Sequence, residues 1–226
     1  MSSKNSILIQ SKRPHQKLKF MYTNIRSLNN KLSEFKVFVE LEKPSILVLN
    51  ETWLSPDVST NILCLPNYTV YRKDRKTRGG GVLIAILFEF NSNEVETVSE
   101  CELLTVDLLP NTLNCIRIIT GYNPSCHDVL NLKEICLQLE KLTHKTQHYV
   151  IIGDLNLPNF DWNKHYMNAT KPNVILQRFL DLSFPIFQII HTPTRNEAIL
   201  DIILTNSLET VRDINDHPQL GLLIIR

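Results

Sequence analysis

The sequence predicts a single α/β domain built on two β-sheets. Short apolar runs typical of buried strands recur along the chain, and stretches with apolar residues at helical spacing separate them. Of the 226 residues, 43% are hydrophobic, so the chain can bury a substantial core. No internal repeat and no linker rich in Gly or Ser divides the sequence. We therefore predict one domain over residues 17–226, preceded by a loose leader over residues 1–16 that lacks periodicity.

The first predicted elements are a strand, a helix and a second strand. The run "LKFMYT" (18–23) indicates a strand, and "SILVLN" (45–50) has the continuous apolar character of a buried strand. Between them, residues 24–43 indicate a helix that stops before Pro44, because a residue that precedes proline disfavours helical backbone. The apolar positions of this helix are Leu28, Leu32, Phe35 and Val39.

Strands and helices alternate through the rest of the chain. A second helix is predicted at about 128–143 and a third at about 172–182. The other strands follow in an order that permits neighbours to pair through short connections. They are "YTVYR" (68–72), "GVLIAILF" (81–88), "ELLTVDLL" (102–109), "NCIRIITGY" (114–122), "HYVIIGD" (148–154), "FQIIH" (187–191), "AILDIILT" (198–205) and "QLGLLIIR" (219–226).

Composition restricts the class of protein. The formal net charge is +1, so any basic surface for a polyanion must be local. The five cysteines form no C-x-x-C pair, which predicts reduced thiols inside a cell. The longest apolar run, "GVLIAILF", is far shorter than the roughly 20 residues that span a bilayer, and residues 1–20 lack a signal-peptide core. We expect a soluble cytoplasmic or nuclear protein.

Polar residues recur where predicted strands end, and strand ends are where α/β folds gather ligand sites. Asn24, Glu51 and Tyr122 stand at the ends of three predicted strands. Asn24 is compatible with a helix cap, Glu51 with a solvated surface position, and Tyr122 with a packed aromatic ring whose hydroxyl is tethered.

The rest of the chain adds five positions that are acidic, carboxamide or histidine. Asp154 and Asn156 follow "VIIG" and are compatible with an Asx-turn. Asp201, within "ILDIIL", needs a partner if it is buried, and the histidine of Asp216-His217 is the obvious candidate. Together with the first three, these residues supply oxygen ligands for a hard cation and a histidine with a carboxylate to orient it. That combination suits phosphodiester chemistry.

These residues, in this order, resemble the endonuclease/exonuclease/phosphatase superfamily, which includes DNase I, exonuclease III and the abasic-site endonucleases. The connecting segments "LNETWLSPDV", "GDLNLPNFDW" and "TPTRNEAILDIILTN" are similar to the endonuclease domain of non-LTR (LINE-type) retrotransposon polyproteins. The resemblance implies a DNase I-like four-layer α/β sandwich, in which two central mixed β-sheets are flanked by helices. It also implies nicking of one DNA strand, whose 3′-hydroxyl primes reverse transcription.

The resemblance assigns a role to each matching residue. Glu51, with Asn24 and Asp216, would bind Mg²⁺, for which Mn²⁺ could substitute. Asp154 would orient and deprotonate the attacking water. The residues that would contact the phosphoryl group are Asn156 and Tyr122, by hydrogen bonds to its oxygens, and His217, which Asp201 would orient.

Four positions depart from the superfamily pattern. Arg26 stands where the DNA-repair members have a second acidic ligand, and Asn215 where "SDH" is usual. Pro218 follows the histidine directly, and Asn123 stands where retrotransposon domains often have Arg. These departures keep open a catalytically decayed remnant that only binds nucleic acid, and a phosphomonoesterase or phosphoinositide phosphatase of the same fold is a further alternative.

One basic cluster, "RKDRKTRGGG" (72–81), precedes three of the six glycines. It is compatible with a solvated hairpin turn or with a grip on DNA phosphates in which the glycines allow close backbone approach. The cations of this cluster are Arg72, Lys73, Arg75, Lys76 and Arg78. The predicted partners are DNA and a reverse transcriptase module of a longer polyprotein, with no membrane.

Overall fold

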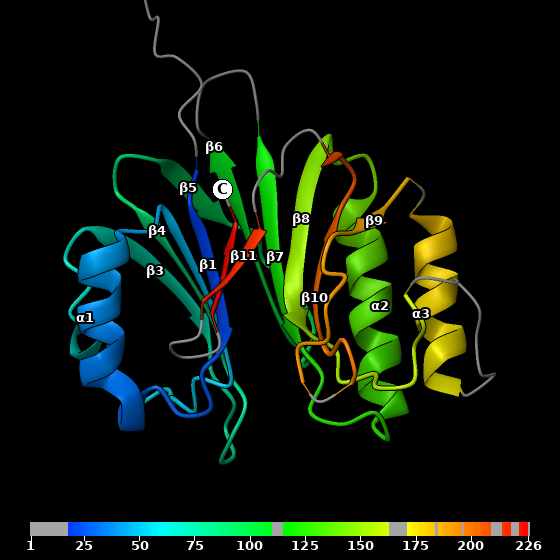
Figure 1. Cartoon of the computed structure of the whole chain (residues 1–226), viewed down its shortest axis with the longest axis horizontal. Helices are drawn as coiled ribbons and strands as arrows, with labels where there is room; N and C mark the ends of the chain where they lie inside the picture. Colours follow the sequence, from blue (N-terminus) through cyan, green and yellow to red (C-terminus); the bar gives the residue numbers. More distant parts are fainter. Residues whose placement is uncertain are drawn as a thin grey trace, which may run out of the picture.

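The computed structural model describes residues 18–109, 115–162, 171–183, 185–195, 197–208, 214–217 and 222–225, with side chains given for residues 18–208 of these ranges except Lys171. The predicted leader 1–16 and Pro218 lie outside the described residues. The described part of the chain forms four layers, with two β-sheets face to face and helices on both outer faces (Figure 1). The α/β prediction on two sheets is therefore confirmed.

The first sheet has the strand order β11-β12-β1-β2-β4-β3. Its strands β1 and β2 are parallel, and its other pairs are antiparallel. Helix α1 (Leu32–Glu42) covers its outer face. The strands are β1 (Phe20–Asn24), β2 (Ile46–Asn50), β3 (Tyr68–Lys73), β4 (Val82–Leu87), β11 (Ile214–His217) and β12 (Leu222–Ile225).

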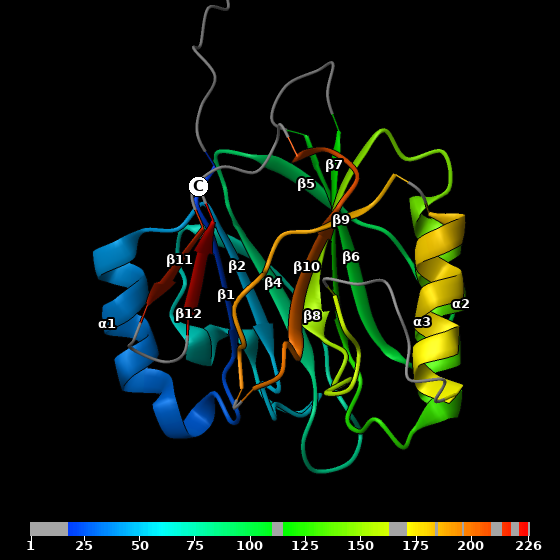
Figure 2. The ribbon, with the colours of Figure 1, turned by 45° about the vertical axis from the view of Figure 1, so that its right-hand side comes forward.

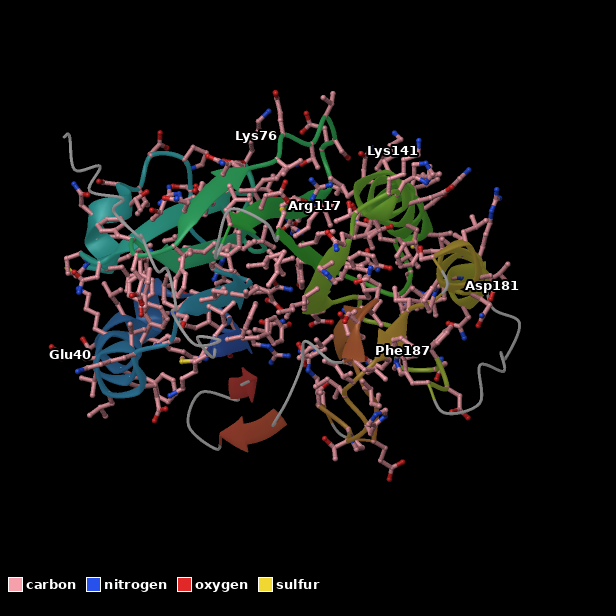
Figure 3. The ribbon with its side chains drawn as sticks, turned by 90° about the horizontal axis from the view of Figure 1, so that it is seen from above. Glu40, Lys76, Arg117, Lys141, Asp181 and Phe187 are labelled. Atoms are coloured by element: carbon pink, nitrogen blue, oxygen red, sulfur yellow. The ribbon has the colours of Figure 1, made fainter. Side chains whose placement is uncertain are left out.

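The second sheet has the order β5-β6-β7-β8-β10-β9, with β7 and β8 parallel. Helices α2 (Val129–Thr143) and α3 (Lys171–Leu182) lie side by side against its outer face (Figure 2). Viewed from above, Glu40 of α1 and Asp181 of α3 mark opposite ends of the layered molecule (Figure 3). The strands are β5 (Asn91–Glu94), β6 (Glu102–Leu109), β7 (Ile116–Tyr122), β8 (His148–Asp154), β9 (Phe187–Gln188) and β10 (Asp201–Thr205).

Both faces of the central strands are buried, which explains their continuous apolar runs. In β2, Ile46 and Val48 face the core between the two sheets, while Leu47 and Leu49 pack in the core beneath α1. A third apolar cluster, which includes Leu132 of α2, fills the space between the second sheet and its helices. The two sheets are thereby fixed against each other, and their strand ends are held rigidly.

The helix predicted over residues 24–43 begins later than expected. Residues Asn29–Lys31 form a 3-10 turn, and α1 starts at Leu32. The residues before them leave helical backbone, since Arg26 and Ser27 have φ angles of +46° and +80°. The chain here pairs instead with the segment after β2, through hydrogen bonds such as Ser27 N to Glu51 O (2.9 Å).

Two strand predictions need correction, and two strands were not predicted. Asp201 opens β10 rather than lying inside it, and the predicted strand 187–191 shortens to Phe187–Gln188. The sequence missed β5, whose residues "NSNE" have no apolar pattern, and β11, which contains Asp216 and His217.

All five cysteines are free thiols. Within the described ranges, no helix combines the length and apolar character needed to span a bilayer.

Candidate active site

Two β-α-β units deliver the candidate residues to one edge of the sandwich. The parallel pair β1 and β2 ends with Asn24 beside Asn50, and the parallel pair β7 and β8 ends with Tyr122 beside Asp154. Because the carboxyl ends of parallel strands share one edge of a sheet, each unit brings its polar residues together. The two edges meet at the lower side of Figure 1, where the loops that follow β1 and β8 lie.

The side chain of Asn24 connects the two sheets. Its Nδ2 donates to Glu51 Oε1 at 2.7 Å and to Asp154 Oδ2 at 2.9 Å. A single amide group thus orients two carboxylates that lie 103 residues apart in the sequence, at positions 51 and 154. The predicted grouping of Asn24, Glu51 and Asp154 is present.

The same carboxamide has an oxygen that fits a cation. Asn24 Oδ1 is buried and has no hydrogen-bond partner among the described residues, although buried oxygens are normally satisfied. Glu51, which is half-buried, accepts a hydrogen bond from the Nδ2 of the same amide. The described residues contain no group of three His, Cys, Asp or Glu side chains that could hold a metal. A carboxylate with one amide oxygen nevertheless suits Mg²⁺, which keeps several waters and uses few protein ligands.

Asp154 is sealed inside the protein. Its side chain is only 1% exposed, and it forms an ion pair with Arg195, whose NH2 lies 3.3 Å from Oδ2. Burial raises the pKa of Asp154 to about 6, and Asp201 adds to this increase, while Arg195 and the hydrogen bonds from Asn24 and Asn156 oppose it. Near neutral pH, Asp154 is thus a carboxylate able to accept a proton.

Asn156 closes a turn at the end of β8. Its backbone N–H donates to Asp154 Oδ1 at 2.9 Å, and its φ of +54° is left-handed, so the Asx-turn considered above is present. Its Nδ2 donates to Pro124 O at 2.9 Å. Asn123 is fully buried next to this turn and donates to the carbonyls of Ser125 (2.9 Å) and Leu155 (3.2 Å). Asn123 therefore stabilises the loops behind the site.

Asp201 lies directly across from Asp154 in the antiparallel pair of β10 and β8. Its Oδ1 accepts a hydrogen bond of 2.7 Å from Tyr22 OH. Burial raises the pKa of Tyr22, and the neighbouring Asp201 raises it further, so this hydroxyl remains a donor. His217 belongs to β11, but its side chain and that of Asp216 lie outside the described residues, so the Asp201–His217 pair stays a prediction.

Tyr122 ends β7 and is 7% exposed. Burial raises its pKa, and the carboxylates of Glu51 and Asp154 raise it further, so its hydroxyl stays protonated. The guanidinium carbon of Arg75 lies 5.8 Å from the centre of the Tyr122 ring. The Tyr122 ring is packed in the protein, and its neutral hydroxyl lies at the site.

The basic cluster forms the hairpin between β3 and β4, which projects at the same lower side in Figure 1. Three of its cations bind the protein itself. Arg72 pairs with Asp74 at 2.8 Å, Lys73 donates to Ser99 O at 2.6 Å, and Arg75 donates through Nε to Glu102 at 2.6 Å. The exposed cations of the hairpin are Lys76 and Arg78, and Figure 3 shows Lys76 at the margin of the molecule.

The hairpin glycines serve packing. A Cβ on Gly80 would come within 2.6 Å of Arg75 Nε, and one on Gly81 within 2.6 Å of Thr52 Oγ1. Both glycines have left-handed backbone, with φ of +65° and +85°. The close approach predicted for these glycines is made to the protein's own chain, at the base of the hairpin.

Sequence reasoning missed two residues of the site. Arg195 lies on a hairpin before β10 and supplies the cation for Asp154. Asn50 is fully buried and bridges the sheets, donating to Gly121 O and accepting from Thr120 Oγ1, both at 2.8 Å. A carboxamide that ends an apolar strand next to Glu51 was the available signal for Asn50, whereas nothing local pointed to Arg195.

Residues 116–221 match a family model described as endonuclease-reverse transcriptase. A comparison with curated proteins found no match. Among solved structures, an AP endonuclease from Leishmania major aligns with a TM-score of 0.70 and 17% identity, covering 92% of this chain and 86% of that one. Another is the endonuclease domain of TRAS1, a telomere-specific non-LTR retrotransposon, with a TM-score of 0.70 and 11% identity over 92% and 97% of the two chains.

A third similar structure is the 3′ phosphatase NExo from Neisseria, bound to a product DNA hairpin. Its TM-score is 0.65 at 14% identity, over 92% of this chain and 98% of that one. At such identities the likeness concerns the fold. The chain thus shares the DNase I-like α/β fold of these structures, and its residues 116–221 match the model of the endonuclease-reverse transcriptase family.

Proposed function

We propose that the chain is a metal-dependent DNA endonuclease of retrotransposon origin that nicks one strand of a duplex. The observation that carries the proposal is the bridge from Asn24 to Glu51 and Asp154, because it joins the two proposed cation ligands to the proposed base. The nick would start target-primed reverse transcription by a reverse transcriptase module of a longer polyprotein. The similarity to the endonuclease domain of TRAS1 supports this role.

Glu51 and Asn24 Oδ1 would hold Mg²⁺ or Mn²⁺, with Asp216 as a further ligand. The bound cation would supply Lewis-acid stabilisation of the negative charge on the phosphate.

In the reaction, the proton of the attacking water would pass to Asp154, whose pKa of about 6 suits a base near neutral pH. The water oxygen would bond to phosphorus, and the bond from phosphorus to the 3′-oxygen would break. The leaving oxygen would take up a proton and become the 3′-hydroxyl.

The remaining residues would stabilise the phosphate and hold the DNA. Tyr122 OH is neutral and can donate to a phosphoryl oxygen. Asn156 Nδ2 uses one hydrogen in its bond to Pro124 O and would donate the other to a phosphoryl oxygen. His217, oriented by Asp201, would stabilise the negative charge of the pentacovalent phosphate. The exposed cations Lys76 and Arg78 would contact backbone phosphates beyond the nick.

Nicking of supercoiled plasmid tests the proposal. We expect relaxed circles in Mg²⁺ or Mn²⁺, no reaction in EDTA, and none with Asp154→Ala or His217→Ala. Metal-dependent nicking that persists in both variants would refute the assignment. Phosphate release from 3′-phosphorylated DNA or phosphoinositides without nicking would replace it with a phosphatase, and salt-dependent DNA binding without turnover would indicate a decayed domain.

A further inference from the structure

The two tryptophans of the chain lie in opposite environments. Trp162 is 9% exposed and packs against Phe160, with ring centroids 4.6 Å apart. Trp53 is 36% exposed, although it lies between Thr52 and Leu54, which are 1% and 2% exposed. Trp53 therefore leaves part of a large aromatic ring in contact with solvent, where it can pack against a ligand.

The backbone holds Trp53 in its outward position. Its φ of +55° is left-handed, which is rare for a bulky residue and persists only where surrounding contacts impose it. These contacts are present, because Trp53 N donates to Gly80 O at 2.9 Å and Thr52 N donates to Gly81 O at 3.2 Å. The base of the basic hairpin therefore fixes Trp53.

The ring lies between the hairpin and the proposed cation ligand. Trp53 Nε1 donates to Glu51 Oε2 at 3.3 Å. A Cβ built on Gly79 would lie 4.0 Å from Trp53 Nε1 and 4.0 Å from Arg75 Nη1. The exposed cations Lys76 and Arg78 belong to the same hairpin. An exposed aromatic ring beside a cationic hairpin is a combination with which proteins bind single-stranded nucleic acid.

We infer that Trp53 is a stacking subsite for an unpaired nucleobase of the DNA strand, next to the phosphate that is cut. The inference rests on the proposed function and adds a substrate preference, namely DNA whose bases are locally unstacked near the nick. Stacking is tolerant of sequence, because every base has a π face. The bond to Glu51 would fix the ring while leaving its exposed area available to the base.

Intrinsic fluorescence tests this subsite without turnover. Wild type, Trp53→Phe and Trp53→Leu are titrated in EDTA with a short single-stranded oligonucleotide. We expect quenching of wild-type emission, and none in Trp53→Leu, whose remaining fluorophore is the buried Trp162. Binding followed by anisotropy of labelled DNA should weaken about tenfold or more in Trp53→Leu and less than about threefold in Trp53→Phe, which keeps an aromatic face.

Two outcomes would overturn the subsite. Equal binding by wild type and Trp53→Leu, while wild type still nicks plasmid, would refute the subsite and leave the endonuclease proposal intact. Equal losses in Trp53→Phe and Trp53→Leu, confined to nicking and restored by more Mg²⁺, would reduce Trp53 to a residue that positions Glu51. A wild type that neither binds nor nicks DNA would refute both proposals.

Discussion

The units β1-α1-β2 and β7-α2-β8 have the same topology, yet they place their carboxylates in different environments. Asp154 is the last residue of β8 and is 1% exposed, with Arg195 paired to it. Glu51 lies one residue beyond β2, in left-handed backbone with φ of +53°, and is half-buried. A shift of one residue relative to the end of the strand therefore distinguishes the buried carboxylate of Asp154 from the half-buried carboxylate of Glu51.

The difference separates two chemical tasks. A carboxylate inside the protein loses hydration, so its proton affinity rises, which suits a base. A carboxylate at the rim keeps access to solvent, so it can exchange water for a cation. Asn24 joins Glu51 and Asp154 through one amide, which lets the proposed cation and base act on a single phosphate.

The largest expected effect comes from exchanging each carboxylate for its amide. Asp154→Asn should lower the nicking rate by about 10²- to 10⁴-fold at every Mg²⁺ concentration, because it removes the base. The nicking rate of Glu51→Gln should be low at low Mg²⁺ and recover as Mg²⁺ is added, because the substitution weakens a proposed cation ligand. Single-turnover nicking measured against Mg²⁺ concentration separates these responses. Identical curves for the two variants would contradict the division of roles.

Stability should respond to Asp154→Asn in the opposite direction. The pKa of Asp154 is about 6 when folded and 3.8 in its unperturbed state, so the folded protein binds the proton more tightly. In the metal-free wild type, the contribution of Asp154 to the free energy of unfolding is fully present below about pH 4. This contribution is lost as the pH rises to about 6. Above about pH 6, the free energy of unfolding of Asp154→Asn should exceed that of wild type by an amount on the order of 2 kcal/mol.

Urea unfolding in EDTA at pH 4 and pH 8 measures this gain as the difference between variant and wild type. Other titrating groups are common to both proteins and cancel. Arg195→Gln is the matched control, because it removes the cation that lowers the pKa of Asp154, so it should destabilise the protein at pH 8. A variant Asp154→Asn that is less stable at pH 8 would show that the carboxylate is not strained by burial.

A smaller effect is expected from the bridge between the two units. Thr120→Val removes the donor to Asn50 Oδ1 and leaves that buried oxygen unpaired, at a cost of about 1–3 kcal/mol. Thr120→Ser keeps the hydroxyl and should cost less. Since Asn50 precedes Glu51 and Thr120 is two residues before Tyr122, Thr120→Val should also slow nicking. Urea unfolding measures the stability loss, and parallel assays measure the nicking rate. Wild-type values of both in Thr120→Val would show that the hydrogen bond between Thr120 and Asn50 supports neither the fold nor the site.

The sequence predicted most of the strands and the grouping of Asn24, Glu51 and Asp154, because apolar runs and the residues at their ends are local signals. It could not predict Arg195, since which cation faces a carboxylate depends on how a hairpin folds over the sheet. For the same reason, the sequence could not predict the protein partners of the cations in the basic cluster. Arg75 was expected to grip DNA, but its partner Glu102 opens a strand of the other sheet.

The smallest effects should come from the exposed cations of the hairpin. Lys76→Ala and Arg78→Ala should each weaken DNA binding uniformly across sequences and reduce the salt slope of log K by about 1, because each removes one phosphate contact. Lys73→Ala is the comparison, since its ammonium donates to Ser99 O, so its loss should affect unfolding more than the slope. Anisotropy titrations at several salt concentrations give these slopes. Slopes that stay unchanged in Lys76→Ala and Arg78→Ala would show that the hairpin does not contact DNA. Reduced slopes would make the surface beside Glu51 the face that receives the DNA.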